Sequence, residues 1–185
     1  MDYQQSRAYI RDAEQYAGGA LDLTNIKEIM KRLGNPQDQL KYVHVAGTNG
    51  KGSVIAYLYT TLTNAGYHVG RYISPSVYSY REKIEVEGTP ISREQFAKHT
   101  TRVAAVIEEM TAEGLAHPTP FEIETAVAFL FFAEEKCDPV ILEVGMGGIT
   151  DATNLIRTTE LAVLVPISMD HQSFLGNTIA EIAEK

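Results

Sequence analysis

The chain has 185 residues, of which 44% are hydrophobic and 22% charged, and its formal net charge is −8. This length and composition predict one globular domain with a buried core, and the acidic balance argues against a nucleic-acid or membrane surface as the main partner. A polar N-terminus without a targeting signal, the lack of any apolar run near the roughly 18 residues of a membrane span, and a single cysteine, Cys137, predict a cytoplasmic protein without an internal disulfide.

The first segments predict two short helices. Residues 3–16 show helical spacing, and so do residues 24–33, where Thr24 is a candidate N-cap. One face of the second helix carries Ile26, Ile29, Met30 and Leu33. The sequence "LGNP" (33–36) then predicts its end.

A glycine-rich turn separates the first predicted strand from the third predicted helix. "YVHVA" (42–46) is rich in β-branched residues and predicts a strand. After the turn, apolar residues recur at helical spacing as far as Gly66. "HVGRYIS" (68–74) predicts a second strand.

The middle of the chain predicts a loop at 75–82, a short strand at 83–88 and a long helix. Ser92, with Gln95 three residues later, predicts a capping box, and the helix should run to about Gly114. "AHPTP" (116–120) reads as a linker.

The last third predicts a strongly apolar helix, two more strands and a final helix. The helix covers 121–135, and the strands cover 139–145 and 161–168. A further helix is expected to begin near Asn177. Cys137 is expected to pack beside the strand at 139.

Strands that are apolar throughout and alternate with helices predict an α/β fold, with a mostly parallel sheet covered by helices on both faces. Ligands of such sheets bind at the carboxyl ends of the strands. Polar segments follow four of the predicted strands: residues 47–53, Ser74, Glu143, and Asp170 with His171. We therefore expect these segments to meet at one edge of the sheet.

A strand, the sequence "GTNGKGS" and a helix together predict a phosphate-binding loop. The glycines let backbone N–H groups converge on phosphate oxygens, and the helix N-terminus adds a partial positive charge. Lys51 would supply a full charge, and Ser53 could ligate Mg²⁺. Gly52 stands where the usual Walker motif has Ser or Thr. The alternative is a glycine-rich turn without a ligand.

Glu143 ends an apolar strand, as the Mg²⁺-binding acid of many nucleotide-binding proteins does. The alternative for Glu143 is an ordinary carboxylate at a strand end. His171 could ligate a metal or contact phosphate, although most single histidines do neither and Mg²⁺ prefers oxygen ligands. His44, His68, His99 and His117 are expected to have no role in the site.

The segment "SPSVYSYREKI" (74–84) carries Tyr78, Tyr80, Arg81 and Lys83. Aromatic rings with cations could hold a flat, anionic substrate by stacking and ion pairing. A solvated loop with ordinary tyrosines is an equally good interpretation of the sequence alone.

Together these segments resemble the folylpolyglutamate synthase/dihydrofolate synthase family of the Mur ligase superfamily, over nearly all 185 residues. The matching motifs are "LGNP" (33–36), "HVAGTNGKGSV" (44–54), "SP" (74–75) with "REKI" (81–84), "PFEIETAVAF" (120–129), "LEVGMGGITDATN" (142–154) and "SMDHQSFLGNTIAEIA" (168–183). The glycine loop alone would indicate only a Mur-type ATPase, whereas the last two motifs are more specific.

The resemblance implies a P-loop NTPase-like domain in an ATP-dependent ligase. Such an enzyme phosphorylates a carboxylate of folate or dihydropteroate, and the amine of L-glutamate then attacks the acyl phosphate. ATP would be bound by Gly47, Thr48, Asn49, Gly50, Lys51, Gly52 and Ser53. Mg²⁺ would be bound by Ser74, Glu143 and His171, and the catalytic residues would be Lys51, Glu143 and His171. The substrate would contact Tyr80, Arg81 and Phe121, and the enzyme is expected to be a monomer.

Three departures qualify the resemblance. Ser76 replaces a common histidine, so it receives no role, and "GGIT" (147–150) lacks the arginine of the commoner "GGRL". The third departure is length, because members of this family are much longer. Residues 1–185 are expected to form the N-terminal part of the ATP-binding domain, without the C-terminal ligase domain. The superfamily's carbamylated lysine would fall one residue beyond Lys185. This chain alone is therefore predicted to be inactive or nearly so.

Two other functions stay open from the sequence. The chain could be a non-catalytic nucleotide-binding module that regulates a partner. It could also belong to a Mur-type ligase that acts on a cell-wall precursor.

Overall fold

The computed structural model describes residues 1–17 and 22–185. The longer helices are α1 (Tyr3–Asp12), α2 (Thr24–Arg32), α3 (Lys51–Asn64), α4 (Arg93–Ala112) and α5 (Pro120–Glu135). Two short helices follow near the C-terminus, α6 (Gln172–Leu175) and α7 (Ile179–Ala183). The described residues also form four 3₁₀ turns: η1 (Ala13–Tyr16), η2 (Pro36–Gln39), η3 (Tyr80–Lys83) and η4 (Ala152–Leu155). Within the described ranges, no helix combines the length and apolar content that crossing a bilayer requires.

The strands form a mixed sheet in the order β4-β3-β2-β5-β1-β6. Their bounds are β1 (Tyr42–Ala46), β2 (Gly70–Tyr72), β3 (Ile84–Val86), β4 (Thr89–Pro90), β5 (Val140–Glu143) and β6 (Thr159–Leu164). Strands β2, β5, β1 and β6 run parallel, whereas β3 and β4 pair antiparallel at one edge. The predicted α/β fold with a mostly parallel sheet is therefore confirmed.

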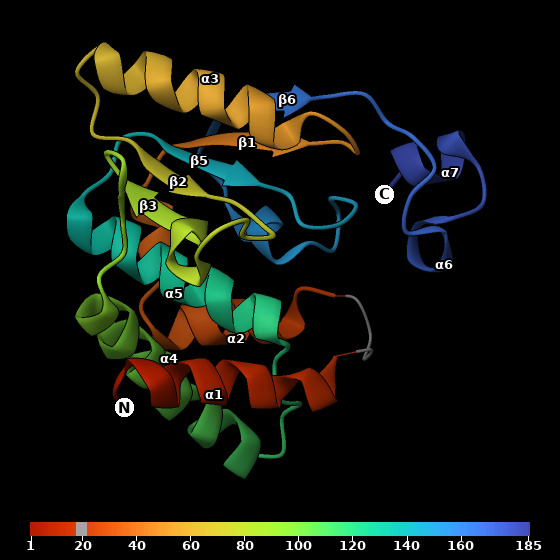
Figure 1. Cartoon of the computed structure of the whole chain (residues 1–185). Helices are drawn as coiled ribbons and strands as arrows, with labels where there is room; N and C mark the ends of the chain where they lie inside the picture. Colours follow the sequence, from red (N-terminus) through yellow and green to blue (C-terminus); the bar gives the residue numbers. More distant parts are fainter. Residues whose placement is uncertain (18–21) are drawn as a thin grey trace.

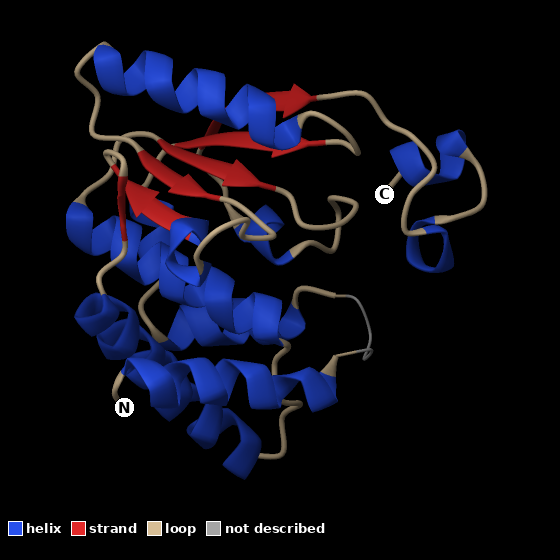
Figure 2. Cartoon of the chain, in the orientation of Figure 1, coloured by secondary structure: helices blue, strands red, loops and turns tan. Residues whose placement is uncertain are grey.

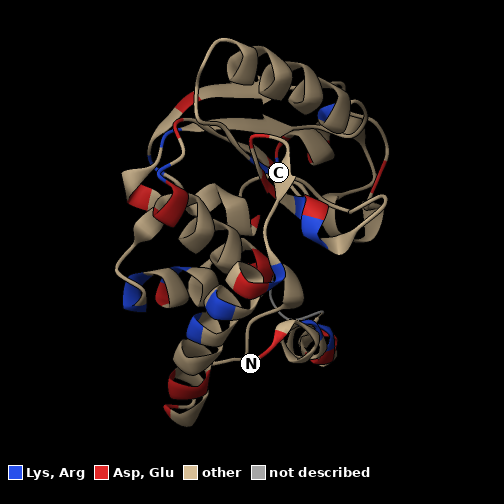
Figure 3. Cartoon of the chain, turned by 60° about the vertical axis from the view of Figure 1, so that its left-hand side comes forward, with Lys and Arg blue, Asp and Glu red and all other residues tan. Residues whose placement is uncertain are grey.

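Helices cover the two faces of the sheet unequally (Figure 1). Helix α3 lies on one face, and α1, α2, α4 and α5 form a thicker layer on the other (Figure 2). Apart from Lys51, α3 carries no charged side chain, whereas acidic and basic residues are interspersed on the helices of the opposite layer (Figure 3). Helices α6 and α7 lie beside the edge where the parallel strands end (Figure 1).

Two hydrophobic clusters fill the space between these layers. The larger contains side chains of α1, α2, α4 and α5 together with Tyr42, Tyr72 and Leu142 of the sheet. The smaller lies under α3 and contains Ile55 and Tyr59. Apolar residues lie all around the axis of α5, and most of the helix is buried, including the carboxylate residues Glu122 and Glu124. Cys137 is buried next to β5, as the sequence predicted.

Hydrogen bonds at the helix starts correct three details of the sequence interpretation. Thr24 is the first residue of α2 rather than its N-cap, and its N–H donates to Oδ1 of Asp22 at 2.7 Å. Ser92 does cap α4 by accepting from the N–H of Gln95 at 3.0 Å. The reciprocal hydrogen bond from the Ser92 N–H to the Gln95 side chain is not formed, and Nε2 of Gln95 donates to Glu135 of α5 at 2.8 Å. Helix α5 begins one residue earlier than predicted, at Pro120.

Strand β6 also differs from its prediction. It begins at Thr159 and forms an edge of the sheet, so most of its side chains are exposed, including Leu161 and Leu164. The expectation of strands covered on both faces therefore fails at β6. Helix α6 was not predicted, because its four residues are too few for a helical period.

Candidate functional site

The glycine loop (residues 47–53) follows β1 and leads directly into α3. Gly47 has φ 128°, and a Cβ atom there would lie 2.5 Å from the carbonyl oxygen of Val165. Thr48 fixes the loop against the segment after β6, because its N–H donates to Pro166 O at 3.0 Å and its hydroxyl oxygen accepts from Ser168 N at 3.0 Å. The close approach of two strand-end segments therefore requires glycine at position 47.

Helix α3 starts without a side-chain cap. Its N-cap is Gly50, with φ 93°, and no side chain in the described ranges bonds to its first N–H groups in that role. A Cβ atom on Gly52 would meet no atom within 4 Å. The uncapped N-terminus of a 14-residue helix therefore faces open space, an arrangement that suits an anion.

Lys51 joins the loop to β5. Its Nζ donates to the carbonyl oxygens of Gly47 at 2.9 Å and Thr48 at 3.4 Å, and lies 3.8 Å from Oε1 of Glu143. The ammonium group is therefore held between two carbonyl oxygens of the loop and the carboxylate that ends β5.

Glu143 is the last residue of β5 and is 8% exposed. Its Oε2 accepts from the N–H of Ser74 at 3.2 Å. Burial raises the pKa of the Glu143 carboxyl above its ordinary value, and the Ser74 N–H and the Lys51 charge act against this rise. The ends of β2, β5 and β1, which are neighbours in the sheet, thus bring Ser74, Glu143 and Lys51 together.

His171 lies further along the segment that follows β6. It precedes α6 with φ 46°, its N–H donates to Oδ1 of Asp170 at 2.8 Å, and half of its side chain is exposed. Among residues 1–17 and 22–185, no group of three His, Cys, Asp or Glu side chains could hold a metal ion. The metal-binding role of His171 therefore stays a prediction.

Two cavities open at this edge of the sheet. The glycine-loop cavity, of about 160 Å³, is lined by Gly47, Thr48, Lys51 and Asp170 among others. The Phe121 cavity, of about 470 Å³, is lined by Ser74, Pro75, Lys83, Thr119, Phe121, Glu122, Asp151 and Ala152 among others. Gly145, Met146 and His171 line both. The segment that follows β5 therefore forms a wall that the two cavities share.

Tyr80 and Arg81 contact the protein itself rather than either cavity, as far as the described residues show. The Tyr80 hydroxyl donates to Glu124, and Cζ of Arg7 lies 3.4 Å from the centroid of the Tyr80 ring. Nη1 of Arg81 donates to the carbonyl oxygen of Ile91 at 2.8 Å. Their substrate-binding roles stay predictions, and their contacts favour structural roles.

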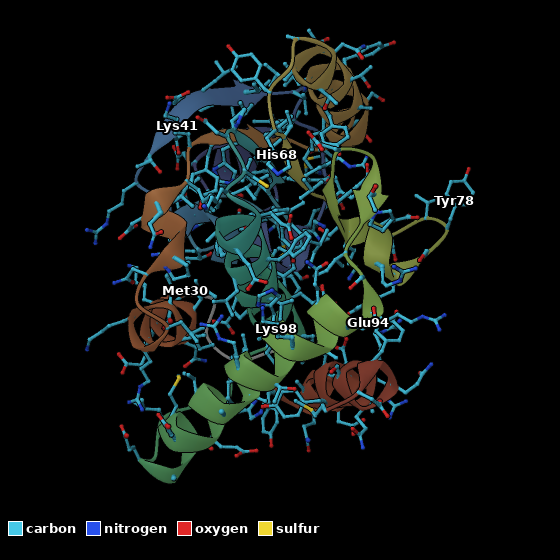
Figure 4. All side chains as sticks on the ribbon, turned by 90° about the vertical axis from the view of Figure 1, so that its left-hand side faces the viewer. Met30, Lys41, His68, Tyr78, Glu94 and Lys98 are labelled. Carbon is cyan, nitrogen blue, oxygen red and sulfur yellow. The ribbon has the colours of Figure 1, made fainter. Side chains whose placement is uncertain are left out.

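The neighbouring Tyr78 projects from the molecule at the tip of its loop (Figure 4). It is 96% exposed, so its ring is not packed against the described part of the chain. Lys83 is the only side chain of the 78–83 segment, all of it described, that lines the Phe121 cavity.

Sequence reasoning missed a buried acid in this site. Both oxygens of Asp151 accept hydrogen bonds, Oδ2 from the N–H groups of Gly145 and Met146 and Oδ1 from Thr153. Asp151 is also the N-cap of η4. The sequence "DATN" offered a local signal, since Asp before a short helical turn is a preferred cap.

Comparisons with known proteins agree on one family. No family model matches the chain. The dihydrofolate synthase/folylpolyglutamate synthase of Bacillus subtilis is 42% identical over 182 residues, which are 98% of this chain and 42% of that protein. The structure of Mycobacterium tuberculosis folylpolyglutamate synthase complexed with ADP matches with a TM-score of 0.86 at 35% identity, over 98% of this chain and 41% of that one.

A further structure, the complex of a folylpolyglutamate synthase with AMPPCP and folate, matches with a TM-score of 0.91 at 35% identity. The match covers 100% of this chain and 45% of that one. The chain thus spans less than half the length of the relatives that it matches.

Proposed function

Because this chain belongs to the folylpolyglutamate synthase/dihydrofolate synthase family, we propose that it supplies ATP-binding and acceptor-binding parts of a ligase. The reaction would join L-glutamate to folate or to dihydropteroate at the expense of ATP. The observation that carries the proposal is the meeting of Lys51, Glu143 and Ser74 at one sheet edge, beside two cavities with a common wall. Residues 1–185 would form the N-terminal part of the ATP-binding domain, in a monomeric, cytoplasmic enzyme.

The glycine loop is proposed to bind the ATP phosphates through Gly47, Thr48, Asn49, Gly50, Lys51, Gly52 and Ser53. The uncapped α3 N-terminus offers N–H groups and a partial positive charge to the phosphates. On binding, the Lys51 ammonium group would exchange the Gly47 and Thr48 carbonyl oxygens for phosphate oxygens. Relatives solved with ADP and with AMPPCP support the binding of a nucleotide by this family.

The donor set near Glu143 fits Mg²⁺. The buried carboxylate of Glu143, which accepts from the Ser74 N–H, and the hydroxyl group that Ser74 carries would provide oxygen atoms. Mg²⁺ is usually held by one or two protein ligands together with phosphates and water. We assign Glu143 and Ser74 as its ligands and His171, which lines both cavities, as a third. A bound Mg²⁺ would neutralise charge that develops on the phosphates.

The Phe121 cavity is proposed to hold the acceptor. Its volume is within the usual range for small-molecule sites, and Phe121 offers an aromatic face. An oxygen of the acceptor carboxylate attacks the γ-phosphorus of ATP, and ADP leaves. The amine of glutamate then attacks the acyl carbon, loses a proton and displaces phosphate, so that an amide remains. The shared wall at Gly145 and Met146 lets the acceptor carboxylate approach the nucleotide.

The test is ADP release by the full-length gene product with ATP, Mg²⁺ and L-glutamate. We expect release to depend on folate or dihydropteroate and the product to carry one more glutamate by mass spectrometry. The 185-residue chain alone is expected to bind nucleotide without forming product. A full-length protein that releases no ADP with either acceptor contradicts the proposal, and stimulation by a cell-wall precursor instead indicates a Mur-type ligase.

A further inference from the structure

A chain of hydrogen bonds runs beneath the wall that the two cavities share. Nε2 of His44 lies 2.8 Å from Oγ1 of Thr153, and Oγ1 of Thr153 lies 2.5 Å from Oδ1 of Asp151. Oδ2 of Asp151 accepts from the N–H groups of Gly145 and Met146, each at 2.9 Å. Thr153 is 0% exposed and Asp151 is 6% exposed. The three side chains therefore connect the interior of β1 to the wall.

The alternation of β1 explains why His44 faces this layer. Val43 and Val45 belong to the cluster under α3, so the side chain of His44 lies on the opposite face of the sheet, with Tyr42. Burial lowers the pKa of His44, so its ring is neutral near pH 7 and carries one N–H. A polar ring at this position of a central strand needs a partner, and Thr153 provides it.

The direction of each hydrogen bond follows from the donors available. The Thr153 hydroxyl donates its one hydrogen to Oδ1 of Asp151. The oxygen of that hydroxyl must then accept from His44, which places the histidine proton on Nε2. His44 thus orients Thr153, and Thr153 orients Asp151.

Gly145 is where this chain meets the Phe121 cavity. A Cβ atom on Gly145 would lie 2.8 Å from Cζ of Phe121 and 3.0 Å from Oδ2 of Asp151. The aromatic ring and the carboxylate therefore converge on the same backbone unit. A small rotation of the Asp151 carboxylate would release two N–H groups and shift the surface against which Phe121 rests.

We infer that His44 is a positioning residue, which acts through Thr153 and Asp151 to hold Gly145 and Met146 in the wall of the acceptor cavity. The expected effect of His44 on activity rests on the proposed function, whereas its expected effect on the backbone at Gly145 and Met146 does not. His44 touches no substrate in this scheme, because Thr153 and Asp151 stand between its ring and the wall.

The first test measures amide hydrogen exchange in the 185-residue chain. His44→Leu removes the donor, His44→Gln retains an amide N–H near the position of Nε2, and Thr153→Val removes the hydroxyl while keeping the shape. We expect exchange at Gly145 and Met146 to rise about tenfold in His44→Leu and Thr153→Val, and to stay within about twofold in His44→Gln. Equal exchange in the Leu and Gln variants overturns the inference.

The second test measures steady-state kinetics of the full-length protein. We expect His44→Leu to raise KM for folate about fivefold, with kcat within about twofold and with rescue in His44→Gln. The double variant with Thr153→Val should show no further rise, since both changes break one chain. A uniform fall in kcat that follows thermal stability, or additive effects, overturns the inference. A wild-type protein without ligase activity refutes the proposed function instead, while the exchange test still decides the role of His44.

Discussion

Nζ of Lys51 lies 3.8 Å from Oε1 of Glu143, at the meeting point of the ends of β1 and β5. The two side chains come from distant parts of the sequence, and both are largely buried. The pair places a buried carboxylate beside the cation that lines the glycine-loop cavity. In the proposed reaction the two residues have different roles: Lys51 would bind phosphate and Glu143 would bind Mg²⁺.

Replacement of Lys51 tests the phosphate site. We expect Lys51→Ala to weaken nucleotide binding at least tenfold, since a charge-assisted contact to phosphate contributes about 1.5–3 kcal/mol. Isothermal titration calorimetry with ADP and Mg²⁺ measures the change. Lys41→Ala is the matched control, because Lys41 is an exposed lysine with two ion pairs at the opposite end of the strand. Equal affinity in the wild type and Lys51→Ala would remove Lys51 from the phosphate site.

Replacement of Glu143 tests the metal site separately. Glu143→Gln keeps an oxygen for the Ser74 N–H but removes the charge, so the fold should persist. We expect Mg²⁺ to raise the nucleotide affinity of Glu143→Gln at least about tenfold less than it raises that of the wild type. Glu85→Gln is the control, because Glu85 is equally buried and pairs with Arg71 on β2. An unaltered Mg²⁺ requirement in Glu143→Gln would exclude this carboxylate as a ligand.

Two glycines of the loop should respond differently to alanine. At Gly47 a Cβ atom would lie 2.5 Å from Val165 O and the backbone has φ 128°, so Gly47→Ala should lower the free energy of unfolding by about 2 kcal/mol or more. A Cβ atom on Gly52 would meet no atom of the described residues within 4 Å beyond its chain neighbours and the backbone of α3, so Gly52→Ala should leave stability unchanged or raise it slightly, as alanine favours helix. Urea denaturation of both variants measures the difference. Similar losses would contradict this account of the loop.

The sequence carried enough information for the part of the site that rests on strand ends. Carboxyl ends of adjacent parallel strands must lie together, so the approach of Ser74, Glu143 and Lys51 followed from the sheet alone. The apolar run at 121–135 also predicted α5, but it placed the start one residue late, because the capping box of Thr119 and Glu122 was not recognised in the sequence.

The rest depended on contacts that no local pattern records. The bond between His44 and Thr153 joins residues 109 positions apart, so His44 read as an ordinary histidine. Strand β6 has the apolar composition of a central strand, and only the sheet order shows that it is an edge. Tyr80 read as an exposed stacking residue because nothing in the sequence pairs it with Glu124.

His99 should make the protein sensitive to acid. Its side chain is 0% exposed in α4, and within the described ranges neither ring nitrogen has a hydrogen-bond partner. Burial lowers the pKa of His99 to about 4, although Glu134, whose Oε2 lies 3.8 Å from Nε2, acts in the opposite direction. The unfolded chain, with a pKa near the ordinary 6.5, then binds more protons between pH 6.5 and 4. The contribution of neutral His99 to the free energy of unfolding should therefore be fully present above about pH 6.5 and be lost as the pH drops towards 4.

Chemical denaturation from pH 7 to pH 4 checks this prediction. We expect the histidine to account for a loss of up to about 3 kcal/mol, and His99→Leu to flatten that part of the profile. His68→Asn is the control, because His68 is partly exposed beside Glu87. A profile that falls equally in wild type and His99→Leu would assign the acid sensitivity to other groups.

Tyr80 offers a choice between a substrate contact and a structural one. Its hydroxyl donates to Glu124, which also accepts from Lys83 Nζ at 2.8 Å and 3.0 Å, and burial raises the pKa of Tyr80 far above its ordinary value. Tyr80→Phe would remove one donor from a buried carboxylate. We expect the free energy of unfolding to fall by about 1–3 kcal/mol and KM for folate to stay within about twofold.

Tyr78→Phe separates the two roles, because Tyr78 lies in the same segment and is 96% exposed. This control should leave stability unchanged, since its hydroxyl is already in water. Thermal unfolding and folate kinetics of both variants in the full-length protein decide the matter. If Tyr80→Phe raises KM for folate and leaves stability intact, the ring contacts the acceptor after all, and the segment around it must move on binding. If stability alone falls, Tyr80 supports the Phe121 cavity from behind by holding Glu124 and, through it, the Lys83 ammonium group that lines the cavity.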